Sequence, residues 1–134
     1  MTPFQLKIVT PDGIVFDGQC ESVTVRTTSG DLGILAGHIN CVAPLGMGQA
    51  TIVMDGKRRC GACIGGMLSV MDGNVTLVPT TFEWADQIDA ERAERSYAKA
   101  QDILSSKESS KTDVAMAEAR LKRALVRKSI ASSR

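Results

Sequence analysis

Hydrophobic and polar side chains alternate with a period of two along the first part of the chain. The alternation is clear over residues 4–8 and recurs over 22–25, 50–54 and 75–77. Successive side chains of a β-strand point to opposite faces, so this period predicts strands with one buried face. Many short strands separated by frequent turns favour a β-sandwich or a flattened barrel.

Asp-Gly pairs punctuate the same region. They occur at Asp12-Gly13, Asp17-Gly18, Asp55-Gly56 and Asp72-Gly73. The central positions of tight hairpin turns require positive φ, which Gly adopts without strain and Asp tolerates. We therefore expect these pairs to form hairpin turns between the strands.

The pattern changes near residues 81–83. All twelve glycines lie between Gly13 and Gly73, and no proline follows Pro79. Residues 1–82 carry 6 acidic and 5 basic side chains, whereas residues 83–134 carry 9 and 11. A loss of turn formers together with a rise in charge favours a change from sheet to helix. We predict a β-sandwich domain at 1–82 and a helical domain at 83–134.

Two amphipathic helices are expected in the second domain. The first is predicted over residues 86–105, and the second is predicted to begin with Thr112 or Asp113 as its N-cap. The polar segment 105–110 connects them, and a short connection favours an antiparallel hairpin. The residues expected between the helices are Ala90, Ala93, Tyr97, Ala100 and Leu104 on the first, and Val114, Ala117, Leu121 and Ala124 on the second.

Alanine dominates this expected seam. An alanine buries about one methyl group, worth about 0.8 kcal/mol, and the entropy cost of ordering the hairpin is of comparable size. We therefore expect a hairpin that is marginally stable alone and that opens when a partner offers a better surface.

Composition narrows the class of protein. The 134 residues are 43% hydrophobic and 23% charged, enough for one compact domain or for a small domain with an appendage. A net charge of +1 argues against nucleic-acid binding. No run of about 18 apolar residues and no secretory signal are found, so we expect an intracellular protein without membrane insertion and with reduced thiols.

The cysteines raise two enzyme or metal alternatives. Cys60 and Cys63 have the spacing of half a zinc or redox site, with Cys20, Cys41 or His38 as further ligands at irregular spacings. Residues three apart on a strand face opposite sides, which favours small buried side chains instead. A nucleophilic pair of Cys41 and His38 is the second alternative, without an evident third group to orient it.

Two basic stripes run along the predicted helices. They are Arg92, Arg95 and Lys99 on the first, and Arg120, Arg123 and Arg127 on the second. Residues at i, i+3 and i+7 share one helix face. An antiparallel hairpin would bring the stripes near each other as a pocket for polyphosphate, and the alternative is two solvated faces with local ion pairs.

Several motifs, in order, resemble the epsilon-subunit family of F-type ATP synthases. They lie at 8–18, 30–38, 65–68 and 74–77, at Ile88-Asp89-x-x-Arg92-Ala93, and at 121–127. Ala36 and Cys41 stand where family members often have proline. The resemblance implies a ten-stranded β-sandwich followed by a two-helix hairpin, and a non-catalytic subunit of the central rotor.

The resemblance also implies partners and a location. The sandwich would dock on the gamma subunit and on the membrane-ring subunits, with the ring contact around Asp31 and His38. The hairpin would reach the alpha/beta catalytic head and restrain ATP hydrolysis, while ion-driven ring rotation is coupled to ATP synthesis. The implied location is the cytoplasmic face of a bacterial membrane, as a peripheral subunit, with a plastid thylakoid as the alternative.

In some bacterial family members the Ile-Asp-x-x-Arg-Ala motif binds ATP and holds the hairpin folded. The corresponding residues here are Glu83, Ile88, Asp89, Arg92, Ala93, Lys99, Arg123 and Arg127. The arginines would meet phosphate, while Asp89 and Glu83 would accept from adenine or ribose or hold the arginines in place. ATP would be a regulatory ligand, with or without magnesium, and no cofactor is required. The alternatives are a free-standing ATP-sensing module and a Cys/His enzyme.

Overall fold

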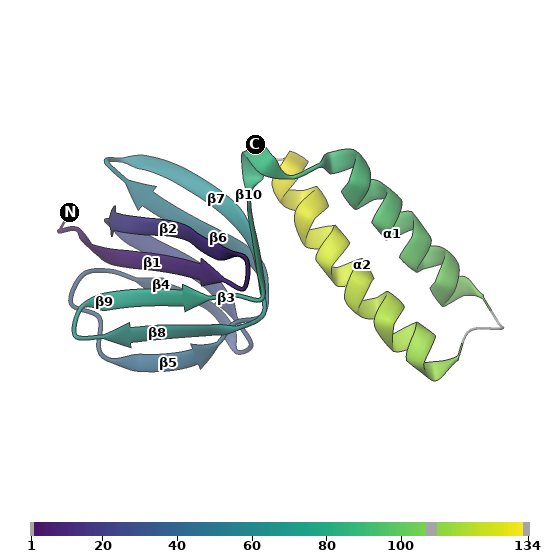
Figure 1. Cartoon of the computed structure of the whole chain (residues 1–134), viewed down its shortest axis with the longest axis horizontal. Coiled ribbons are helices and arrows are strands. Elements are labelled where there is room, and N and C mark those ends of the chain that lie inside the picture. The colour runs from purple at the N-terminus through teal and green to yellow at the C-terminus, as the bar shows by residue number, and fades with distance from the viewer. Residues whose placement is uncertain (1, 107–109, 133–134) are drawn as a thin grey trace. The chain divides into compact units, whose positions relative to one another are not determined.

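The computed structural model describes residues 2–106 and 110–132 of the chain. It divides into two compact units, Met1–Trp84 and Ala85–Arg134 (Figure 1). The first unit consists of strands and the second of helices.

The first unit is a β-sandwich, which confirms the predicted fold class. Within the described residues its strands are β1 (Phe4–Thr10), β2 (Gly13–Cys20), β3 (Ser22–Thr27), β4 (Gly30–Ile34), β5 (Cys41–Pro44), β6 (Met47–Met54), β7 (Lys57–Ile64), β8 (Met67–Met71), β9 (Asn74–Val78) and β10 (Thr81–Trp84). They form two five-stranded sheets, ordered β2-β1-β9-β8-β5 and β10-β7-β6-β3-β4. β1 pairs with β9 in parallel, and the other paired strands are antiparallel.

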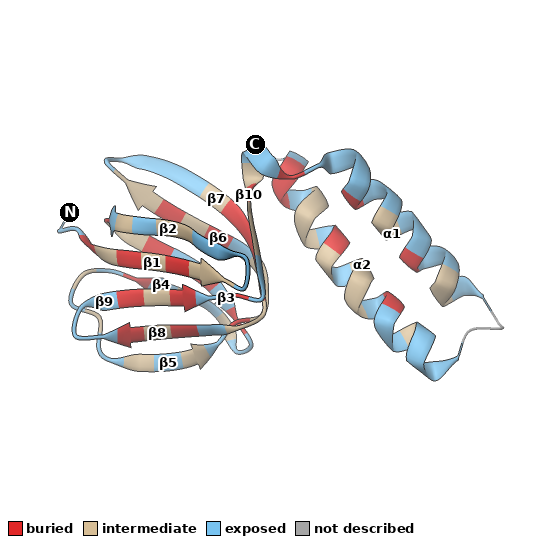
Figure 2. Cartoon of the chain, in the orientation of Figure 1, coloured by how far each residue is buried: buried red, intermediate tan, exposed pale blue. Residues whose placement is uncertain are grey.

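The core of the sandwich lies between the two sheets and follows the period of two. Leu6 and Ile8 on β1 and Val23 and Val25 on β3 are all fully buried, while their neighbours along each strand are more exposed. Figure 2 shows this alternation as buried segments along the strands. Both sheets contribute to one hydrophobic cluster, so the sandwich is held together by its inward faces.

Three of the four Asp-Gly pairs form turns, and the expectation for Asp17-Gly18 is wrong. Asp55 and Asp72 have φ values of 51° and 50°, as hairpin turns of this kind require. Asp17 lies inside β2 instead, opposite Lys7 of β1, and its carboxylate accepts a 2.7 Å hydrogen bond from Gln5 Nε2. Pairing along the whole of β1 overrides the local turn preference there.

The second unit contains a 3₁₀ turn, η1 (Ala85–Gln87), and two helices, α1 (Ala90–Ser105) and α2 (Lys111–Ser132). The sequence predicts that the first helix begins at residue 86, but α1 begins after its N-cap, Asp89. Residues 85–87 form the separate turn η1, in which the Ile88 N–H donates a 3.5 Å hydrogen bond to Ala85 O. No helix of the described residues is long and apolar enough to span a membrane.

The N-cap of α2 is Ser110, not Thr112 or Asp113. Ser110 Oγ accepts a 3.1 Å bond from the Asp113 backbone N–H, and Asp113 Oδ2 accepts a 3.4 Å bond from the Ser110 N–H. This reciprocal arrangement is a capping box, which satisfies two backbone donors that have no partner within the helix. The expected connection at 105–110 falls partly on residues 107–109, outside the described residues.

The helices meet along the predicted alanine seam. Ala93 and Ala100 on α1 and Ala117 and Ala124 on α2 are buried. Ala90 was expected in the seam but is exposed, because it lines an open groove together with residues near the end of α2.

Candidate functional site

One face of the hairpin is fixed by a contact between the helices. Lys128 on α2 lies with Nζ 2.8 Å from Glu94 Oε2 and 4.1 Å from the centre of the Tyr97 ring, both on α1. A shallow groove on the same face is lined by Ala90, Glu94, Leu125, Lys128, Ser129, Ala131 and Ser132. We call this the Lys128 face.

The cations expected to bind phosphate lie on the opposite side, because an α-helix turns about 100° per residue. Arg92 therefore lies about 200° around α1 from Glu94, and Arg123 lies about 200° around α2 from Leu125. Because α1 and α2 run antiparallel, Arg92 and Arg123 therefore lie on the same side of the hairpin, opposite the Lys128 face. Arg92, Lys99, Arg123 and Arg127 form what we call the basic face.

The register of the helices places cations from both at the same level. Lys99 lies five residues after Glu94 on α1, and Arg123 lies five residues before Lys128 on α2. Because the helices are antiparallel, Lys99 and Arg123 lie at the same level, about 7.5 Å along the hairpin from the Glu94–Lys128 pair. Arg92 and Lys99 are exposed, and Arg123 and Arg127 are half-buried. Cations from both helices therefore lie on the same side of the hairpin and partly at the same level.

Arg95 departs from this arrangement. It is exposed, and its Nη1 lies 3.9 Å from Oε2 of Glu91, one turn earlier on α1. This is the local i, i+4 ion pair expected of a solvated face.

The Ile88–Ala93 motif sets the start of α1. Asp89 is the N-cap, with φ −80° and ψ 101°, and its Oδ1 accepts a 3.0 Å hydrogen bond from the backbone N–H of Arg92. Ile88 and Ala93 occupy the positions of a hydrophobic staple, just before the cap and at the fourth residue of the helix, and each is 3% exposed. Asp89 and Arg92 are the exposed members of the motif, and the Asp89 carboxylate already caps the helix.

Glu83 belongs to the other unit. It lies on β10, opposite Ala62 of β7, and is half-buried. The remaining seven residues of the predicted ATP set lie in the helical unit.

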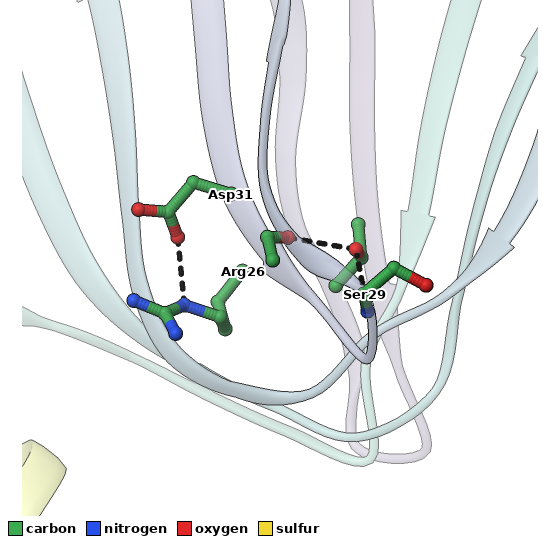
Figure 3. Close-up of polar contacts among 5 residues, drawn as sticks. Arg26, Ser29 and Asp31 are labelled. Atoms are coloured by element: carbon green, nitrogen blue, oxygen red, sulfur yellow. Dashed lines mark hydrogen bonds and ion pairs between the residues drawn. The ribbon is translucent and has the colours of Figure 1, made fainter.

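Asp31, predicted to contact the ring, lies at the start of β4 next to a tight turn. Its Oδ1 is 2.7 Å from Nε of Arg26, directly across the β3–β4 pair (Figure 3). Thr27 Oγ1 closes the turn by donating to Gly30 O at 2.7 Å and accepting from Ser29 N at 3.2 Å. The family resemblance indicated Asp31 but not Arg26, because the pairing of these two residues depends on the register of β3 and β4.

His38 lies in the loop between β4 and β5. Its backbone N–H donates to Leu35 O at 3.2 Å, and its ring Nδ1 lies 2.8 Å from Ile39 O. Leu35 and Ile39 are 52% and 77% exposed. The loop therefore offers apolar side chains to its surroundings beside the histidine.

The cysteines are spread over the sandwich. Cys63 lies in the core, where burial raises its pKa to about 12, and burial together with the Glu21 carboxylate raises the pKa of Cys20 to about 11. Cys60 lies on the other face of β7, where its sulfur is 3.2 Å from Gln49 Nε2. Thiols that stay protonated are poor nucleophiles and poor metal ligands. Among the described residues, no group of three or more His, Cys, Asp or Glu side chains is placed to hold a metal ion.

Fold and site together define a small two-domain protein, a β-sandwich followed by a helical hairpin with cations from both helices on its basic face. The family models for the ATP synthase delta/epsilon chain match both parts, the beta-sandwich domain over residues 3–85 and the long alpha-helix domain over 86–132. The chain belongs to the delta/epsilon chain family of ATP synthases, which confirms the resemblance drawn from its motifs.

Individual relatives are similar along nearly the whole chain. The ATP synthase epsilon chain of Bacillus velezensis is 44% identical over 99% of this chain and 100% of its own length. That of Ruminococcus albus is 41% identical over 100% of both chains. A chain in the solved structure of the Euglena gracilis mitochondrial ATP synthase (OSCP/F1/c-ring) has a TM-score of 0.82 at 23% identity, covering 96% of this chain and 80% of that one, and so shares its fold.

Proposed function

We propose that this chain is the epsilon subunit of an F-type ATP synthase and acts as a non-catalytic part of the central stalk. The observation that carries the proposal is its similarity, from end to end, to bacterial chains named ATP synthase epsilon chain. As a rotor subunit it couples ion-driven rotation of the membrane ring to ATP synthesis in the catalytic head. It is a peripheral subunit on the cytoplasmic face of the bacterial membrane.

The sandwich is the docking unit for the gamma subunit and the polar loops of the ring. Asp31 and His38 form the ring contact. The Arg26–Asp31 pair supports this assignment because it holds the carboxylate in place beside a tight turn, ready to pair with a donor on a ring loop. Exposed Leu35 and Ile39 beside His38 add apolar area to the same contact.

The helical hairpin restrains ATP hydrolysis by opening toward the alpha/beta head. Its buried residues on α1 are two alanines, so little apolar surface opposes the opening. The basic face then meets acidic segments of the catalytic subunits, where charge complementarity sets register.

ATP binds the basic face and keeps the hairpin closed. Arg92, Arg123 and Arg127 bind phosphate, and Lys99 adds a fourth cation. Asp89 holds Arg92 in position by capping α1, with Ile88 and Ala93 anchoring the same turn. A ligand that bridges the two helices binds the closed form and not the open form, so its binding shifts the equilibrium toward the closed form.

The rotor assignment is tested with an ATP synthase of a Bacillus relative from which epsilon has been removed. Adding the full chain is expected to restore a stable complex and to slow ATP hydrolysis. A chain that neither co-purifies with the gamma subunit nor changes the hydrolysis rate would overturn the assignment.

ATP binding is tested by calorimetry on the isolated full chain, with and without magnesium. Three charge-assisted bonds of about 1.5–3 kcal/mol each support micromolar to millimolar affinity after ordering costs. Arg123→Ala is expected to abolish this binding, whereas Lys122→Ala, the adjacent exposed cation turned away from the basic face, leaves it unchanged. No binding by the unmodified chain at several millimolar ATP would reject the ATP site and leave the rotor assignment in place.

A further inference from the structure

Lys128 joins the two helices through an ion pair and a cation–π contact. Its ammonium group lies 2.8 Å from the Glu94 carboxylate and 4.1 Å from the centre of the Tyr97 ring, so one cation has two partners on α1. The Lys128 side chain is 32% exposed and the Glu94 side chain is 61% exposed, so water screens the ion pair at its Glu94 end while the lysine itself is partly shielded.

Tyr97 is itself held in place. Gln101 Nε2 donates a 3.0 Å hydrogen bond to the Tyr97 hydroxyl. Glu94, Tyr97 and Gln101 are spaced at i, i+3 and i+7, so they form one row along α1. This row presents a carboxylate and an oriented ring to a single side chain of α2.

We propose that Glu94, Tyr97 and Lys128 form a latch that sets how often the hairpin opens, independently of nucleotide. The alanine seam contributes little energy per residue, so a cation with two partners accounts for a large share of the closed form's advantage. The latch lies on the Lys128 face, away from the basic face, so it closes the hairpin without occupying the cations assigned to ATP.

The sequence gives no local signal for this latch. Glu94 and Lys128 lie on different helices, separated by the connection, and their pairing depends on the antiparallel register. Lys128 lies outside both basic stripes, and Tyr97 is predicted only as an apolar seam residue.

Hydrogen exchange on the isolated full chain tests the latch without ATP or partner subunits. Lys128→Met keeps an unbranched apolar stem of similar length and removes the charged ammonium group. Losing an ion pair together with a cation–π contact is expected to speed exchange of the α1 and α2 amides roughly five- to thirty-fold. The β-sandwich amides serve as the internal reference and are expected to exchange at the unmodified rate.

Matched variants separate the latch from a general effect of charge or helix propensity. Lys122→Met removes an exposed cation from the same helix and is expected to change exchange less than twofold. Lys128→Arg keeps both the charge and the stacking ability and is expected to restore slow exchange. Glu94→Gln alone is expected to speed exchange. The double variant with Lys128→Met and Glu94→Gln is expected to exchange at the same rate as Lys128→Met alone.

The proposal is overturned if the helix amides of Lys128→Met exchange within twofold of the rate in the unmodified chain. It is also overturned if Lys122→Met speeds exchange as much as Lys128→Met does. The consequence for regulation rests on the proposed function: within the complex, Lys128→Met should raise the ATP concentration that relieves inhibition by the same factor. An exchange effect without any change in hydrolysis would retain the latch and count against the regulatory role of the hairpin.

Discussion

Arg59 lies over the indole ring of Trp84, with its guanidinium carbon 3.7 Å from the ring centroid. Trp84 is the last residue of β10 and is 4% exposed. Phe16 and Phe82 meet the same ring edge-on, at centroid distances of 6.2 and 4.9 Å. The final residue of the sandwich is therefore fixed from several sides by aromatic and cationic contacts.

Replacing Arg59 with alanine should loosen this end of the sandwich. A cation–π contact at an exposed site contributes about 0.5–1 kcal/mol, so the free energy of unfolding is expected to fall by about that amount. Trp84 is the chain's one tryptophan, so its emission reports the site directly and should shift to the red. Arg58→Ala is the matched control, and an equal shift in that variant would contradict the stacking role of Arg59.

Gly66 is expected to be the glycine of the sandwich that least tolerates a side chain. It has φ +87°, and a Cβ there would collide with the backbone oxygen of Val78 and lie 2.7 Å from Pro79 Cα. Gly66→Ala should lower the free energy of unfolding by about 2–5 kcal/mol, from backbone strain and overpacking together. Urea unfolding followed by Trp84 fluorescence measures the loss.

Gly73→Ala is the control for strain alone. Gly73 has φ +82°, but a Cβ there would meet nothing within 4 Å. A loss of about 1–2 kcal/mol is expected from the left-handed conformation. Equal losses in the two variants would show that the close approach of Val78 has no energetic consequence.

Cys63 should make the stability of the sandwich depend on alkaline pH. Its pKa is raised by burial from 9.0 to about 12, so above pH 9 the unfolded chain loses a proton that the folded chain retains. Stability from this thiol is complete below pH 9 and declines as the pH rises toward 12, by about 1.4 kcal/mol per pH unit.

Urea unfolding from pH 8 to 10.5 measures this slope. Cys63→Ala should be less stable at pH 8 yet show a shallower decline, because the titrating thiol is gone. Cys60→Ala, on the opposite face of β7, is expected to keep the slope of the unmodified chain. A slope unaffected by Cys63→Ala would mean that the thiol ionises equally well in the folded state.

The fold was predictable where local pattern and tertiary packing agree. Leu6 and Ile8 alternate with polar residues because one face of β1 is buried, and that pattern is visible in the sequence. Asp17-Gly18 was mispredicted because its strand pairing is with β1, a partner that the dipeptide itself does not specify. Local signals are reliable only when no longer-range pairing competes with them.

The candidate site shows the same limit. Helical spacing predicted that Arg123 and Arg127 share a face, since that follows from the period alone. It did not predict that Lys128, one residue later, faces Glu94, because the register between two helices is set by packing across the seam. The cap of α2 was likewise misplaced by two residues or more, since Thr112, Asp113 and Ser110 are all capable of capping a helix.

Asp89 provides a test of what the Ile-Asp-x-x-Arg-Ala motif does. Its Oδ1 caps α1 through the Arg92 N–H, and asparagine caps a helix as well as aspartate does. Asp89→Asn should therefore keep the hairpin's stability and bind ATP within about threefold of the unmodified chain. Asp89→Ala loses the cap, which costs about 1 kcal/mol, and should weaken both hairpin stability and ATP binding.

Circular dichroism during urea unfolding measures the helical hairpin, and calorimetry measures ATP affinity in the same two variants. If capping is the role of Asp89, affinity follows hairpin stability across the pair, because Arg92 is positioned only when α1 begins at residue 90. If Asp89→Asn keeps the helix but loses ATP as completely as Asp89→Ala does, the negative charge itself contacts the nucleotide. The amide substitution separates these roles because it retains the cap acceptor and removes the charge.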